Sequence, residues 1–324
     1  MANLLALIRA LHFCACLLPL SVFATLLLVV NPASGRVAVK ASMPSSFSGA
    51  AAHFHRQMRN LLAGCFVTAF ISGFLWLWFS IAGMSGSTLR ESLDAGMFKM
   101  VLTQTPPGHI WLLRAALLLM LATACMFRHS PFVIRHLLPL LLGGCLAGTL
   151  AWLGHAGAAE GLSAKFHLAA DVLHLLSAAI WPGGLVPFVL FIRLLLKSSD
   201  PGLLTVASTA TRLFSSMSLA AVAVLAASGS VNSYFLVGSF HALFSTEYGR
   251  LLLFKLGLFV VMITIGAINL LILKPSLAAT PGADSRDKAV LQKIMRNVCI
   301  ELCLGTLLLL VVGILGITPP AIHP

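Results

Sequence analysis

Residues 251–273, LLLFKLGLFVVMITIGAINLLIL, decide the fold class of this chain. An α-helix needs about 20 apolar residues to cross a bilayer, and this run contains a single charged residue, Lys255. Similar runs recur along the 324 residues, of which 59% are hydrophobic and 9% charged, whereas a soluble protein carries about 25% charged residues. Backbone groups in lipid are satisfied only inside helices or closed barrels, and these runs are too long for barrel strands. The sequence therefore predicts an all-α, polytopic integral membrane protein.

Eight apolar runs predict a bundle of eight transmembrane helices that forms a single transmembrane domain over residues 1–324. The expected spans are 4–30, 59–83, 109–128, 134–155, 166–194, 206–236, 250–273 and 298–318. The first run has no basic segment ahead of it and no clear small-residue cleavage site, so we expect a retained span rather than a signal peptide. The connections between the spans leave no room for a soluble domain.

The basic residues predict how the helices are oriented. Lys and Arg are concentrated in the connections after the first, third, fifth and seventh spans, whereas the opposite connections contain only Arg90, Lys99, Lys165 and Arg250. Cytoplasmic loops carry the excess of Lys and Arg, so we expect both termini outside, in the periplasm of a bacterium. Because topology accounts for the net charge of +12, that charge is no argument for nucleic-acid binding. The seven cysteines lie in apolar runs, which argues against the disulfide framework of a small secreted domain.

Three ionisable residues interrupt the fifth span, in the segment HLAADVLHLLSAAIWPGG (residues 167–184). His167, Asp171 and His174 are spaced i, i+4 and i+7, so they share one stripe of a helix. A charged side chain at mid-bilayer costs about 3 kcal/mol, which makes the stripe a candidate functional site. The helical rise separates the two histidines by about 10 Å. This leaves two arrangements, a ladder of sites or one site in which Asp171 orients an imidazole.

A fourth residue, His155, ends the fourth span in the sequence WLGHAG. The connection to the fifth span is about ten residues long, so the two helices are expected to be antiparallel neighbours with His155 and His167 at one level. Imidazole and carboxylate ligands suit divalent copper, zinc or iron. Metal or proton handling by His155, His167, Asp171 and His174 is the favoured interpretation, and structural hydrogen bonding is the alternative.

Other polar or sulfur-containing residues are secondary candidates. As metal ligands they are His12, His109, His241, Met84, Cys299 and Cys303, and as gating or structural residues they are Trp181, Pro182, Gly183, Gly184, Lys255, Asn269 and Glu301. The Trp-Pro-Gly-Gly sequence predicts a break in the fifth span, because proline removes a backbone hydrogen bond. Glu301 is expected to pair with Lys255 or Arg296, either to hold helices together or as part of a transport path.

Several stretches carry a family resemblance. They are RALHF in the first span, WLGHAG, HLAADVLHLLSAAIWPGGLVPF, EYGRLLLFKLGLFVVMITIGAINLLILKP and the closing RNVCIELCLGTLLLLVVGILGITPP. Together they resemble the CopD copper-resistance family of bacterial inner-membrane proteins, with its YG..L..K......gA.N pattern and its final R...E......vv..LG..PP helix. The resemblance runs through nearly all of the chain and departs from the family pattern at Pro182, where an aliphatic residue is expected.

The resemblance implies a protein that moves copper, as Cu(I) or Cu(II), across the bacterial cytoplasmic (inner) membrane. It implies His155, His167, Asp171 and His174 as copper-binding residues near the periplasmic face, and a transporter rather than an enzyme. It also implies a separate periplasmic CopC-like copper-binding partner, because the chain contains no β-rich copper-binding domain. No Walker motif is present, so we expect no ATP hydrolysis by this chain. Import and export are not distinguished.

Two alternatives to copper transport stay open. One is a haem-binding membrane oxidoreductase, in which His155 pairs with His174 or His12 as the two axial ligands. The other is a membrane scaffold for a periplasmic copper chaperone that transports nothing itself.

Overall fold

The computed structural model describes residues 2–40, 45–127, 131–154, 161–197, 200–277 and 284–322. In these ranges every regular element is helical and there is no strand. Eight helices of the described chain are long and apolar enough to cross a membrane: Asn3–Arg36, Phe47–Ser85, Pro106–Ala124, Val133–Leu153, Leu162–Leu196, Gly202–Val237, Glu247–Ser276 and Arg286–Leu315. Each predicted span overlaps one of them, so the predicted fold class is confirmed.

The spans are assembled from shorter helical elements. In chain order these are α1 (Ala2–Thr25), η1 (Leu26–Val30), α2 (Asn31–Lys40), α3 (Ser45–Ser85), η2 (Glu91–Leu93), α4 (Ala95–Gln104), α5 (Pro106–Ala124), η3 (Val133–Leu137), α6 (Leu138–Gly148), η4 (Thr149–Leu153), α7 (Leu162–Ala178), η6 (Ala179–Gly183), α8 (Leu185–Leu196), α9 (Pro201–Val237), α10 (Phe240–Ser245), α11 (Glu247–Ile268), η7 (Asn269–Leu273), η8 (Lys274–Ser276) and α12 (Asp284–Leu315). Four of them, η1, η3, η6 and η7, are π-helical turns inside a span. Such turns are frequent at functional sites.

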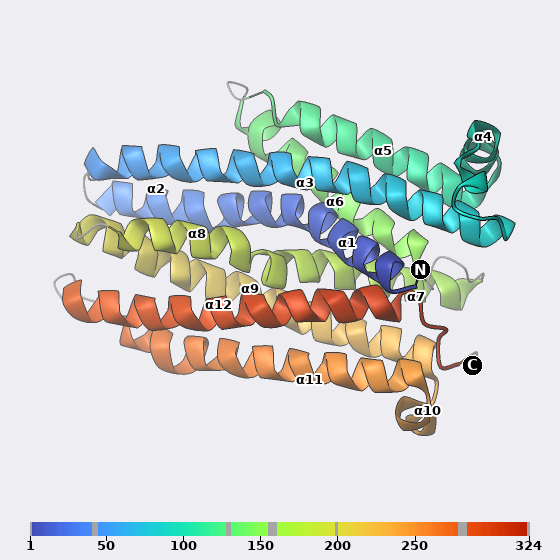
Figure 1. The fold of residues 1–324 in the computed structure, drawn as a ribbon. Helices are drawn as coiled ribbons and strands as arrows, with labels where there is room; N and C mark the ends of the chain where they lie inside the picture. The colour runs from blue at the N-terminus through green and yellow to red at the C-terminus, as the bar shows by residue number, and fades with distance from the viewer. Residues whose placement is uncertain are drawn as a thin grey trace.

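Figure 1 shows the long helices running side by side, with α4, α10 and both chain ends at the same end of the bundle. The first span is the central one: α1 packs against α3, α6, η6 and α12. In the first span, 72% of the most apolar segment is buried inside the protein. In the seventh span the corresponding share is 6%, so this span lies at the edge of the bundle. The expectation that both termini lie in the periplasm stays a prediction.

Two long helices at this end begin in the same way. Thr105 and Thr246 cap α5 and α11, and each side chain accepts a hydrogen bond from the backbone N–H of the glycine three residues on, Gly108 or Gly249. Threonine is a favoured cap because its oxygen satisfies one of the free N–H groups of the first turn. The glycines are required by a close approach, since a Cβ on either one would collide with a backbone carbonyl of the preceding short helix.

The predicted break in the fifth span is confirmed. The helix α7 ends at Ala178, and the π-helical turn η6, which contains Pro182, leads into α8. The central helix α1 contacts this turn closely, because a Cβ on Gly183 would collide with Oγ of Ser21. Ser21 Oγ also donates a hydrogen bond of 2.7 Å to the carbonyl of Ala179. A side chain from a neighbouring span therefore satisfies a backbone acceptor inside the break, as the membrane interior requires.

Candidate functional site

The polar stripe on α7 faces α9 and is held by it. Nδ2 of Asn232 donates a hydrogen bond of 3.0 Å to Oδ1 of Asp171. One turn further along α7, Nδ1 of His174 lies 3.3 Å from Oγ of Ser228. The chain order of the partners is reversed between the two helices, as expected for antiparallel neighbours. Both polar side chains of α7 therefore lie in its interface with α9.

The contacts of His174 favour a proton on Nδ1. The hydroxyl hydrogen of Ser228 is directed toward the carbonyl of Val224 at 2.7 Å. In this arrangement the Ser228 oxygen accepts from Nδ1–H of His174, and the same edge of the imidazole lies against Gly229. In the neutral imidazole the other nitrogen, Nε2, then carries a lone pair. This is the tautomer that a histidine presents to a metal ion through Nε2.

Charged and polar groups from α11 surround the Asp171 carboxylate. Lys255 lies within electrostatic range of both Asp171 and His174, and Tyr248 within range of Asp171. From the α6 side, the position that a Cβ would take on Gly154 is 3.8 Å from Oδ2 of Asp171. The carboxylate thus has one oxygen hydrogen-bonded to α9 and the other directed toward the end of the fourth span.

His167 makes an aromatic contact with α9. Its imidazole is 6% exposed and stacks on Phe235 of α9, with ring centroids 4.9 Å apart and planes inclined by 16°. Within the described ranges, no group of three or more His, Cys, Asp or Glu side chains is placed to hold a metal ion. His155 lies outside the described residues. The four-residue site of His155, His167, Asp171 and His174 therefore stays a prediction.

A second polar cluster lies deep in the bundle around His12. Nη2 of Arg114 donates to Nε2 of His12 at 2.7 Å, and Nδ1 of His12 lies 3.0 Å from Oγ of Ser72. Arg114 also donates to Oγ1 of Thr149 at 2.8 Å and to Sγ of Cys16 at 3.3 Å. Both ring nitrogens of His12 are used by these bonds, so in this arrangement neither is free for copper or for a haem iron. The cluster joins α1, α3, α5 and η4 inside the membrane.

The remaining secondary ligand candidates lie apart from the α7 stripe. Nε2 of His109 lies 3.1 Å from the carbonyl of Thr103, and this carbonyl accepts from the imidazole. The side chains of the other four candidates are exposed: Met84, His241, Cys299 and Cys303. None of the secondary candidates belongs to a metal-binding group of three within the described residues.

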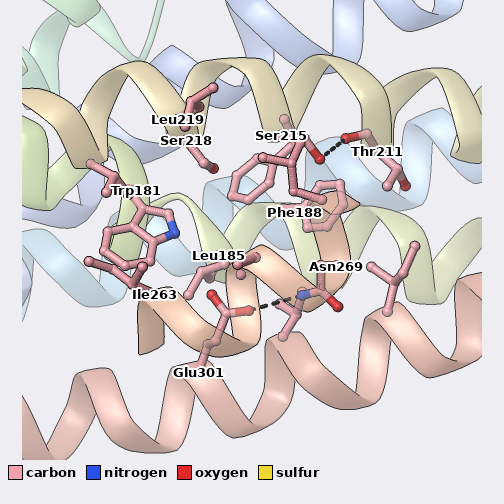
Figure 2. Close-up of a pocket in the computed structure, with 17 residues that line it drawn as sticks. Trp181, Leu185, Phe188, Thr211, Ser215, Ser218, Leu219, Ile263, Asn269 and Glu301 are labelled. Carbon is pink, nitrogen blue, oxygen red and sulfur yellow. Dashed lines mark hydrogen bonds between the residues drawn. The ribbon is translucent and has the colours of Figure 1, made fainter. Parts of the chain in front are cut away.

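A third polar feature is a cavity of about 130 Å³ between η6, α8, α9, α11, η7 and α12. Figure 2 shows the Glu301 carboxylate reaching into it from α12, below Trp181 and Leu185. Oε1 of Glu301 accepts a hydrogen bond of 3.0 Å from Nδ2 of Asn269, and Oδ1 of Asn269 accepts one of 2.8 Å from Asn297. The expected ion pair of Glu301 with Lys255 or Arg296 is wrong.

The two expected basic partners are engaged elsewhere or exposed. Lys255 interacts electrostatically with Asp171 and His174, and Arg296 is exposed. Asparagine amides take the place of the cation beside Glu301. Ser228 and Asn232 were not predicted as site residues, although they recur at i and i+4 in the apolar sixth span. That spacing marks one helix face and was a usable signal.

Two family models match most of the chain. Residues 1–166 match the model described as "Copper resistance protein D-like, N-terminal domain", and residues 208–315 match the one described as "Copper resistance protein D". The chain belongs to the copper resistance protein D family. As a member of this family it is a multi-pass inner-membrane protein, and the family supports a role in copper homeostasis.

Three curated relatives are similar to this family member. "Copper resistance protein D" of Pseudomonas syringae pv. tomato is 32% identical over 223 residues, which are 68% of this chain and 71% of the relative. "Inner membrane protein YebZ" of Escherichia coli (strain K12) is 30% identical over 238 residues, 74% and 77% of the two chains. "Copper transport protein CutJ" of Bacillus subtilis (strain 168) is 32% identical over 231 residues, 70% of this chain but only 42% of the relative. No solved structure matches.

Proposed function

We propose that this member of the copper resistance protein D family transports copper across the inner membrane and binds it, as substrate, on the α7 stripe. The observation that carries the proposal is the orientation of His174. Ser228 accepts from Nδ1–H, which leaves the Nε2 lone pair for a metal ion. Metal-binding histidines commonly have their other ring nitrogen held by a hydrogen bond of this kind.

The donor atoms around the stripe suit copper. Imidazole nitrogen and carboxylate oxygen are good ligands for Cu(II), and imidazole also serves Cu(I). We propose that His155 and His167 receive copper at the periplasmic end and that Asp171 and His174 take it further inward. The resulting path has four protein ligands over about 10 Å of helix rise. That length favours successive sites over one chelate.

Lys255 gives the stripe a means of exchanging one cation for another. In the state described here its ammonium group acts on Asp171 and His174, so it balances the carboxylate charge when copper is absent. A copper ion that binds Asp171 takes over this role, and repulsion between the two cations favours release. Lys255 therefore lowers the copper affinity of the stripe, so that bound copper can be released.

The inward route passes the break of the fifth span. His174 lies one turn before Ala179, where the π-helical turn η6 begins. Broken helices expose backbone groups to a central path in many transporters. Because the chain has no ATP-binding motif, we propose that an ion gradient or a carrier supplies the driving force. A separate periplasmic CopC-like protein is the proposed copper donor or acceptor.

Copper flux into proteoliposomes tests this function. Purified wild type is expected to move copper into sealed vesicles, and Asp171→Asn is expected to abolish the movement. Thr103→Ala, on α4 and with a hydroxyl that bonds only within its own helix at Lys99, serves as the matched control and should behave as wild type. A wild type that binds copper but moves none supports the scaffold alternative. A Soret absorbance band in the purified protein would support haem binding instead.

A further inference from the structure

The Glu301 cavity contains a carboxylate whose charge no neighbouring group balances. Glu301 is 2% exposed and lies near the middle of α12. Oε1 accepts one hydrogen bond, from the neutral amide of Asn269, and Oε2 accepts none from the described residues. An ionised carboxylate in this position is costly in hydrocarbon, unless a proton or a metal cation neutralises it.

The charged groups on the surrounding elements point elsewhere. Glu301 is the one lining residue of the cavity that carries a formal charge. On α8 and α12, Arg193 and Arg296 are exposed. On α9, Arg212 donates a hydrogen bond of 3.0 Å to the carbonyl of Leu277. On α11, Lys255 acts on the α7 stripe. The described part of the chain therefore supplies no internal counter-ion.

The chemistry of the lining excludes copper as the ligand. The cavity is lined by no histidine, cysteine or methionine. Besides Glu301, the polar side-chain groups that line it are hydroxyl groups, an amide and the indole N–H of Trp181, and Oγ of Ser218 is buried without a hydrogen-bond partner (Figure 2). Oxygen donors favour a hard cation over copper. A proton needs only one oxygen of the Glu301 carboxylate, whereas a sodium ion would have to draw several further oxygens from the lining hydroxyl groups and from water.

The cavity also has room for water, which a proton needs in order to reach Glu301. A water molecule requires about 10–15 Å³ of probe-occupied volume and two or more polar partners, and the cavity measures about 130 Å³. Two π-helical turns border it, since Trp181 of η6 and Asn269 of η7 both line it. The same turn η6 follows the proposed copper-binding stripe, so the two sites share one irregular segment.

We propose that Glu301 is a proton-binding site in the middle of the membrane and that its proton is exchanged against copper during transport. The second part of this statement rests on the proposed copper transport, and the first part does not. Protonation neutralises the carboxylate in the cavity. Loss of the proton leaves a charge that is stable only when water enters from one side.

Carbodiimide labelling tests the proton site without reference to copper. Dicyclohexylcarbodiimide reacts with protonated carboxyl groups in apolar surroundings, and mass spectrometry locates the modified residue. We expect Glu301 to be modified in wild type and the modification to fall at least tenfold as the pH is raised. Glu91 is the internal control: hydrogen bonds from the N–H and hydroxyl of Thr88 lower the pKa of this exposed carboxyl, so it should stay unmodified.

Two variants of Glu301 test whether the carbodiimide label depends on its carboxyl group. Glu301→Gln should lose the modification while retaining the wild-type elution volume, and Glu301→Asp should retain part of it. An unmodified Glu301, or modification that does not respond to pH, would overturn the proton site. Protection by sodium chloride but not by choline chloride at constant pH would identify a sodium site instead and overturn the proposal equally.

The exchange against copper is measured separately, with a pH-sensitive dye inside the proteoliposomes. Copper influx into wild-type vesicles should be accompanied by proton efflux, and Glu301→Gln should reduce proton movement by tenfold or more. Labelling that behaves as expected in a wild type without copper flux would refute the transport function and leave the proton site intact. Copper flux in Glu301→Gln with unchanged proton efflux would refute the exchange.

Discussion

Asn232 on α9 donates from Nδ2 to Oδ1 of Asp171 on α7, at 3.0 Å, while its own Oδ1 is buried without a hydrogen-bond partner. An unsatisfied buried acceptor costs about 1–3 kcal/mol. Because this oxygen lies beside a carboxylate, we expect a proton on Asp171 or a bound cation to satisfy it. The pair therefore links the packing of two transmembrane helices to the proposed copper site.

Replacing Asn232 by leucine removes both the donor that orients Asp171 and the unsatisfied oxygen. We expect copper affinity to fall about 10–100-fold, which is typical when a residue that orients a ligand is lost. The measurement is a copper-binding titration against a competing chelator. The control is Ser230→Ala on the same helix, where the exposed hydroxyl bonds only to its own helix at Ala226. Equal affinity of Asn232→Leu and wild type contradicts the assignment.

Replacing Ser228 by alanine removes the acceptor that holds Nδ1–H of His174. The imidazole can then rotate or change tautomer, so we expect weaker copper binding by about 10-fold or more. Ser228→Thr keeps the hydroxyl and should restore the wild-type affinity. The same titration distinguishes the two variants. If the threonine variant binds as weakly as the alanine variant, the hydroxyl has no part in orienting His174.

Replacing Lys255 by methionine removes the cation that balances Asp171 in the absence of copper. We expect a lower melting temperature without copper and a larger copper-induced increase in that temperature, because a ligand that binds only the folded state stabilises it more as its dissociation constant falls. Thermal unfolding of detergent-purified protein, with and without copper, measures both effects. Arg250→Met, at an exposed position of α11, is the control. A copper-induced shift smaller than in wild type argues against competition between Lys255 and copper.

Replacing Gly183 by alanine tests the contact between α1 and the break of the fifth span. The added Cβ collides with Oγ of Ser21, and overpacking of this kind costs about 1–3 kcal/mol. Gly144→Ala, on α6 with open space around its Cα, should be neutral or stabilising. In the double variant with Ser21→Ala the combined loss should be smaller than the sum, because the clashing hydroxyl is gone. If the losses in free energy of unfolding of the two single variants simply add in the double variant, the two positions do not touch.

The sequence predicts the architecture well because lipid imposes simple requirements on it. Runs of about 20 apolar residues are needed to cross the membrane, and the break at Pro182 follows from a missing backbone hydrogen bond. The family resemblance and the copper role were likewise readable from short motifs along the chain. These features depend on local composition and on residues close in sequence.

The partners of the buried polar residues were much harder to predict. Glu301 was expected beside a lysine or arginine and instead contacts Asn269, while Lys255 interacts electrostatically with Asp171 and His174 on α7. His12 was a candidate ligand until Arg114, 102 positions away, was seen to donate to it. Helical spacing tells which residues share one face, but it does not tell which face of another helix they meet.

The most direct test of the account is the amount of copper bound at a fixed free copper concentration by purified wild type and by His174→Gln, a variant of similar size in which a carboxamide replaces the imidazole. The account predicts copper in the wild-type protein and at least a tenfold loss of affinity in the variant. Equal copper contents in the two proteins would contradict the assignment of the α7 stripe as the copper site.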